Sequence, residues 1–112
     1  MKKATFIRVV EKNSLSDREN EQRLFKLNPP VETPGYEYDE FYINEYVIVS
    51  CVVLPGDYGI DTMVFPADEN GNIISFTEID RTDGDWDFEK VLINMGYYVE
   101  NLKDKLDKIL NE

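Results

Sequence analysis

The chain has 112 residues and a net charge of −11, a length typical of one domain, so we expect residues 1–112 to form a single unit. The excess charge lies in the middle, because residues 31–89 hold fifteen acidic side chains and one basic side chain, Arg81, whereas residues 1–30 hold seven basic and four acidic ones. A field of this sign repels phosphates and anionic lipids and attracts basic proteins, which excludes direct binding to nucleic acid or membranes.

The first segments of the sequence favour strands. Residues 3–11 are rich in β-branched and aromatic side chains and predict a strand. A polar stretch follows, for which a loop and a short surface helix both remain open. Residues 23–27 predict a short second strand that stops at Pro29 and Pro30, because proline has no N–H to give to a sheet.

Residues 28–45 are the least regular part of the sequence. Three prolines and five acidic residues favour an exposed loop. Four aromatic side chains are expected to pin this loop to the body: Tyr36, Tyr38, Phe41 and Tyr42. The alternation of tyrosines with acidic residues over 36–39 also suits an edge strand, and the sequence does not decide between the two structures.

The clearest strand covers residues 46–54, which are apolar on both faces and therefore predict a position in the middle of a sheet. Two further strands, 61–68 and 72–80, flank Asn70-Gly71, the best short-range signal for a hairpin. The three strands together predict an antiparallel meander over residues 46–80.

A regular apolar stripe predicts one long C-terminal helix, from about residue 87 to residue 110. Its members are spaced alternately by four and three positions: Phe88, Leu92, Met95, Val99, Leu102, Leu106 and Ile109. Tyr98 lies beside this stripe and Tyr97 points away from it. Gly96 falls in the middle of the helix, so a break into two helices is the alternative.

The predicted elements give an α+β fold, in which an antiparallel sheet of four or five strands packs against the long helix. The stripe of the helix also has the spacing of a coiled-coil seam, which allows a homodimer through the C-terminal helix. The sequence has no signal-peptide pattern and no apolar run long enough for a membrane span. With one unpaired cysteine, these features predict a cytoplasmic protein.

Nothing in the sequence indicates catalysis. Histidine, the commonest general base and metal ligand, is absent, and no phosphate-binding loop or nucleophile elbow occurs. Cys51 lies within the apolar strand 46–54 and predicts a small buried hydrophobic residue. We therefore expect no enzyme activity, no cofactor and no metal.

The spacing of Asp83, Asp85 and Asp87 imitates the first ligands of a calcium loop. Phe88, however, stands where such a loop needs glycine, and the final glutamate is missing. A solvated loop whose acids cap the helix is the interpretation we prefer. A calcium-binding module or a carboxylate-based enzyme is retained as an alternative.

The favoured function is that of a small non-catalytic interaction protein that binds a basic protein partner through its acidic surface. The candidate residues are acids and one tryptophan: Glu37, Asp39, Glu40, Glu45, Glu78, Asp80, Asp83, Asp85, Trp86, Asp87 and Glu89. If these carboxylates formed one row, they would resemble nucleic-acid phosphates. The alternative is therefore a nucleic-acid mimic that inhibits a DNA- or RNA-processing enzyme.

The segment 62–73, Glu78-Ile79 and Met95-Gly96-Tyr97 resemble small uncharacterised proteins encoded by phages and mobile elements. The resemblance covers residues 46–97, less than half of the chain, and brings no known activity or binding residues with it. It implies a gene carried by a mobile element, where inhibitors of host defence are common.

Overall fold

The computed structural model describes residues 2–10, 22–35, 41–53, 60–84 and 87–100, and in these residues the protein is mostly β-structure. The elements are β1 (Lys3–Val10), β2 (Gln22–Pro34), β3 (Phe41–Val53), β4 (Ile60–Ala67), β5 (Asp80–Asp83), α1 (Lys90–Asn94) and β6 (Tyr98–Glu100). The predicted α+β fold with a long helix is therefore wrong.

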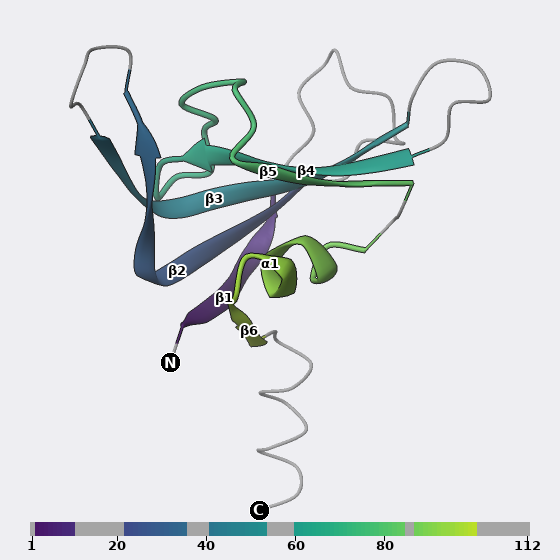
Figure 1. Cartoon of the computed structure of the whole chain (residues 1–112), viewed down its shortest axis with the longest axis horizontal. Helices are drawn as coiled ribbons and strands as arrows, with labels where there is room; N and C mark the ends of the chain where they lie inside the picture. Colours follow the sequence, from purple (N-terminus) through teal and green to yellow (C-terminus); the bar gives the residue numbers. More distant parts are fainter. Residues whose placement is uncertain (1, 11–21, 36–40, 54–59, 85–86, 101–112) are drawn as a thin grey trace, which may run out of the picture.

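The six strands form one curled sheet in the order β5-β4-β3-β2-β1-β6 (Figure 1). Neighbouring strands are antiparallel, except that β6 runs parallel to β1. The short helix α1 packs over one face of the sheet. The prediction of a central strand over residues 46–54 is confirmed for residues 46–53, which fall within β3, whereas Leu54 lies outside the described residues.

Strand β2 continues past the prolines that were expected to stop it. The pairing of β2 with β3 shifts register between Lys26 and Val31, so Pro29 and Pro30 fall where the regular ladder is interrupted and their missing N–H groups are tolerated. Beyond this shift, residues 31–34 pair with residues 41–44. The described parts of residues 28–45 therefore belong almost entirely to strands and not to an exposed loop. Residues 36–39, for which the edge strand was considered, lie outside the described residues, as do Tyr36 and Tyr38.

The predicted hairpin turn after β4 is present, but the strand 72–80 is not. Gly71 has a φ of +87°, which glycine adopts readily, and the pairing after the turn is limited to a bridge between Ala67 and Ile73. The Ser75 hydroxyl accepts a hydrogen bond from the Thr77 N–H at 3.2 Å. Such local bonds compete with a sheet ladder, and regular pairing with β4 resumes at Asp80.

Asp68 holds this turn through its side chain. Its carboxylate accepts hydrogen bonds from the N–H groups of Asn70 and Asn72, each at 2.9 Å, and from the Asn72 amide at 3.1 Å. The bonds from Asn72 are the main cause of a pKa of Asp68 below its usual value.

We expect the turn to loosen in acid. Because the pKa of Asp68 is lowered by folding, its bonds stabilise the turn at pH values above the unfolded pKa of 3.8 and are lost as the pH falls through the lower folded value. The amide NMR shifts of Asn70 and Asn72 should therefore change together, with a midpoint below 3.8. In Asp68→Asn this transition should disappear. A wild-type midpoint above 3.8 would contradict the assignment.

The helix ends early because of Gly96. This residue has a φ of +94°, its N–H donates to the carbonyl of Ile93 at 2.9 Å, and the Tyr97 N–H donates to the carbonyl of Leu92 at 3.0 Å. These two bonds close the helix with a left-handed glycine cap, after which residues 98–100 join the sheet beside β1. The last three of the seven residues in the predicted stripe and dimer seam, Leu102, Leu106 and Ile109, lie outside the described residues.

The main core lies between the sheet and α1. It includes Phe25 and Leu27 of β2, Val47 and Val49 of β3, and Leu92 of α1. A smaller cluster on the other face joins Leu24, Ile48 and Ala67. Cys51 is buried, as predicted.

The two neighbouring tyrosines have positions opposite to those expected from a long helix. Tyr97 is buried, with 4% of its surface exposed, and its hydroxyl donates a hydrogen bond to the carbonyl of Pro29 at 2.7 Å. Burial raises the pKa of Tyr97. Tyr98 is 52% exposed on the outer strand β6. The strand after Gly96 thus reverses the orientation of the pair.

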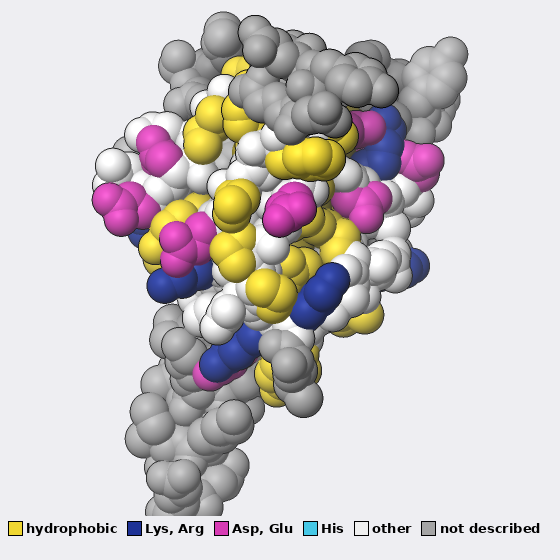
Figure 2. Space-filling model, turned by 60° about the vertical axis from the view of Figure 1, so that its left-hand side comes forward, with side chains coloured by type: hydrophobic (Ala, Val, Ile, Leu, Met, Phe, Trp, Pro, Cys, Tyr) yellow, Lys and Arg dark blue, Asp and Glu magenta, His cyan; other side chains and the backbone are white. Residues whose placement is uncertain are grey.

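Among the described residues, no helix is long and apolar enough to cross a membrane. On the face drawn in Figure 2, hydrophobic side chains gather on the surface with acidic and basic side chains among them. Large apolar side chains therefore remain in contact with solvent.

Candidate functional site

The structure places six of the eleven residues that the sequence nominated as an acidic surface. The other five lie outside the described residues: Glu37, Asp39, Glu40, Asp85 and Trp86. The six described residues do not form one row, because several of them are held by hydrogen bonds or ion pairs in different parts of the chain, as set out below.

Glu45 stands apart from the others. Its carboxylate lies 3.4 Å from the Lys26 ammonium of β2. Asp61 of β4, whose neighbours are described next, pairs with Val52 of β3, and the seven residue steps from Glu45 to Val52 span about 23 Å of strand. Glu45 and the acids beside Asp61 thus lie at different ends of β3.

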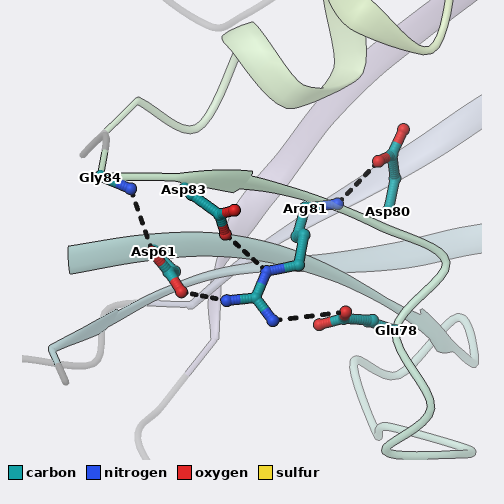
Figure 3. A network of polar contacts seen from close by, with 6 residues as sticks. All are labelled: Asp61, Glu78, Asp80, Arg81, Asp83 and Gly84. Carbon is teal, nitrogen blue, oxygen red and sulfur yellow. Dashed lines mark hydrogen bonds and ion pairs between the residues drawn. The ribbon is translucent and has the colours of Figure 1, made fainter. Parts of the chain in front are cut away.

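Three carboxylates surround Arg81 at the edge of the sheet (Figure 3). The guanidinium donates to Asp83 at 2.7 Å and to Glu78 at 3.5 Å, and it forms an ion pair with Asp61. The Asp61 side chain is 5% exposed and also accepts the Gly84 N–H at 3.0 Å. The hydrogen bond to Asp83 is the main cause of the raised pKa of Arg81.

The charged side chains around Arg81 protect the edge of the sheet that β5 forms. Strand β5 has four residues and carries charged side chains, and the Arg81 N–H is bonded at 2.8 Å to the carboxylate of Asp80. Short, charged edge strands with occupied backbone groups resist pairing with other chains. The sequence alone did not reveal this arrangement, because Asp61 is twenty residues away from Arg81.

We expect the two central members of this group to differ in their effect on stability. Asp61→Asn should lower the free energy of unfolding by about 1–3 kcal/mol, since it weakens a buried charge-assisted bond while Glu78 and Asp83 still neutralise Arg81. Arg81→Met should be more damaging, because it leaves the Asp61 carboxylate buried without a counter-charge. Urea unfolding of both variants measures the order, and the reverse order would contradict the structural role.

The remaining acids lie at the start of α1. The Asp87 carboxylate accepts the N–H groups of Glu89 at 2.9 Å and Lys90 at 3.2 Å, so it closes the turn that leads into α1, whereas the N-cap position that the sequence assigned to Asp85 or Asp87 is occupied by Glu89. Asp83 is bound to Arg81 instead, and among the described residues no group of three or more metal-ligating side chains is placed to hold a metal ion. The described part of the Asp83–Asp87 spacing therefore does not converge on a calcium site.

An exposed apolar feature of the structure is an arm made by residues 31–34 of β2 and 41–44 of β3. The arm projects from the upper left of Figure 1, away from α1. Three consecutive large side chains of the arm are open to solvent: Phe41 (63% exposed), Tyr42 (43%) and Ile43 (70%). Successive residues of a strand point to opposite faces, so both faces of the arm present apolar surface.

The base of the arm is held by a buried side chain. Asn44 is 7% exposed, and its amide donates to the carbonyl of Val31 at 3.2 Å and to the Thr33 hydroxyl at 3.0 Å. The expectation that Phe41 and Tyr42 pin a loop to the body is therefore wrong. They are carried outward on a braced strand pair.

The sequence segment that contains the arm, residues 31–45, is strongly acidic. Residues 31–45 contain five acidic side chains and no basic one. Of these acids, Glu32 is exposed on the arm and Glu45 follows it directly on β3. The run Phe41-Tyr42-Ile43 was the sequence signal for an exposed contact, but from the sequence it has the same pattern as a core strand.

Comparison with protein-family models, with curated proteins and with solved structures finds no match for this chain. The resemblance to phage-encoded proteins over residues 46–97 stays a prediction from the sequence.

Proposed function

We propose that this chain is a non-catalytic binding protein that docks its arm on a basic protein. The observation that carries the proposal is the exposure of Phe41, Tyr42 and Ile43 on a projecting strand pair. Exposed contiguous apolar surface is typical of sites for protein contacts, and aromatic side chains contribute strongly to the binding energy of such contacts. A two-stranded ribbon is also only marginally stable in water, so a partner that covers the arm would stabilise it.

The charge of the arm determines the kind of partner. Five acidic residues between 31 and 45, with no basic residue among them, favour an apolar patch bordered by lysine and arginine. The net charge of −11 accelerates the approach of such a partner at low salt. The apolar contacts then hold the complex, while the acids select the partner.

The described acids give more support to this function than to nucleic-acid mimicry. A mimic needs carboxylates in an extended row, whereas Glu78 and Asp83 are gathered around Arg81 and Glu45 is paired with Lys26. An apolar arm has no counterpart in a phosphate backbone.

The proposal is tested by capture from a host lysate with the full chain immobilised. Wild type and the double variant Phe41→Ser/Ile43→Ser are compared, with Ile93→Ser as the matched control, because Ile93 is a similarly exposed isoleucine on α1. We expect a basic protein to be retained by wild type and control and lost from the arm variant. Its retention should also weaken as salt rises.

Two results would overturn the proposal. One is capture of the same proteins by the arm variant as by wild type. The other is a captured partner that is acidic, or whose retention does not depend on salt. Circular dichroism of each variant shows that the sheet is intact before the capture is interpreted.

A further inference from the structure

A second feature of the structure is a pocket of about 560 Å³ between β1 and the turn after β4. The sheet curls so that this turn reaches β1, although β3 and β2 lie between β4 and β1 in the sheet. Arg8 donates a hydrogen bond to the carbonyl of Asn70 at 2.5 Å. None of the described residues that line the pocket belongs to the arm, so the inference does not rest on the proposed function.

The wall at the turn depends on a glycine. A Cβ atom on Gly71 would lie 3.2 Å from both the Arg8 guanidinium and the Val10 side chain. The absence of a side chain thus lets the backbone approach β1 closely, and the Asp68 bonds described above hold it there. The Arg8 guanidinium is therefore positioned at a braced wall.

The lining combines one cation with carboxamides and apolar groups. Among the described residues that line the pocket, Arg8 is the charged one, and the carboxamides belong to Gln22, Asn70 and Asn72. Phe76 forms part of the apolar wall, is 77% exposed, and packs edge-on against Phe65 with ring centroids 6.0 Å apart. The volume of this open, mainly polar pocket lies in the range of small-ligand sites.

We infer that this pocket binds a small organic carboxylate with an apolar, aromatic body. The guanidinium has five N–H donors in a fork that matches a carboxylate, and the bond to Asn70 uses one nitrogen. The exposed Phe76 ring offers a face or edge to the apolar body. One cation among the described lining residues, in a chain of net charge −11, suits a monoanion better than a doubly charged phosphate ester.

The test is an NMR titration of the full chain with 3-phenylpropanoate. Its neutral amide and phenyl phosphate serve as comparison ligands. Saturable shifts are expected at the amides of residues 8–10 and 70–73 at up to about 10 mM ligand, since a compound of this size binds with a dissociation constant on the order of 1 mM. The amide should bind at least about tenfold more weakly, because it lacks the charge.

Variants separate the two parts of the site. Arg8→Gln should weaken binding of the carboxylate ligand by about tenfold or more. Lys26→Gln, which removes one positive charge from β2, should leave the affinity for this ligand unchanged. Because Arg8 also holds the turn, Phe76→Ala is a second variant that leaves the Asp68 bonds intact; it should weaken binding about threefold or more.

The inference is overturned by any of four results. These are an absence of saturable shifts at the pocket amides, equal binding of acid and amide, tighter binding of phenyl phosphate than of the carboxylate, and unaltered affinity in both Arg8→Gln and Phe76→Ala. None of these results bears on the arm, so the two proposals fail separately.

Discussion

Tyr97→Ala is expected to lower the free energy of unfolding by about 3–5 kcal/mol, whereas Tyr98→Ala should change it by less than about 0.5 kcal/mol. Tyr97 is buried in the main core, so its removal leaves a cavity and also deprives the Pro29 carbonyl of a hydrogen bond. Tyr98 is half exposed at the edge of the sheet. A continuous helix through Gly96 predicts the opposite order, with Tyr98 beside the apolar stripe.

Urea unfolding of both variants measures the difference, and Tyr97→Phe is the matched control. The phenylalanine keeps the ring in the core and removes the hydroxyl bond to Pro29, so it should cost about 0.5–1.5 kcal/mol. If Tyr98→Ala were the more damaging change, the short helix and the strand β6 would both be wrong.

The prediction of a long helix failed because the buried residues of α1 and of β6 together keep the spacing of a single helical stripe. Phe88 and Leu92 are buried beside or within α1, and Val99 is buried in β6. A stripe counted along the sequence therefore continues across Gly96 although the helix does not. The informative signal was the glycine itself, since glycine just after a helix is the commonest residue at a left-handed cap.

The strands were easier to predict where local pattern and tertiary contacts agree. Residues 46–54 are apolar on both faces because β3 is covered on both, by the main core and by the smaller cluster around Ile48. The arm could not be predicted in this way. Its apolar run resembles a core strand, and exposure depends on the absence of a covering layer, which local sequence does not encode.

The acidic surface was predicted from net charge, but ion pairs between segments far apart in the sequence neutralise several of its carboxylates. Lys26 reaches Glu45 across the β2–β3 pair, and Arg81 reaches Asp61 across the β4–β5 pair. Composition counts all of these acids as surplus, whereas the sheet register brings a base beside them. The segment 31–45 still has no basic residue of its own, although Lys26 lies beside its last acid, Glu45.

The second large effect concerns binding of the captured partner. Phe41→Ala/Ile43→Ala should weaken the complex by at least about 100-fold, because exposed anchors that become buried at an interface commonly contribute about 2 kcal/mol each. The loss should appear mainly as faster dissociation. The free energy of unfolding should change by less than about 1 kcal/mol, since both side chains are exposed in the free protein.

Glu32→Gln/Glu45→Gln changes the same arm by charge alone and should act differently. We expect slower association and a shallower dependence on salt, with an affinity loss of about tenfold or less, because charges at the rim of an interface mainly steer the encounter. Ile93→Ala on α1 is the control for both and should bind as wild type. Surface plasmon resonance at several salt concentrations separates the two rates. If the acidic pair carried the larger loss and the apolar pair none, binding would be electrostatic and the exposed arm would have another role.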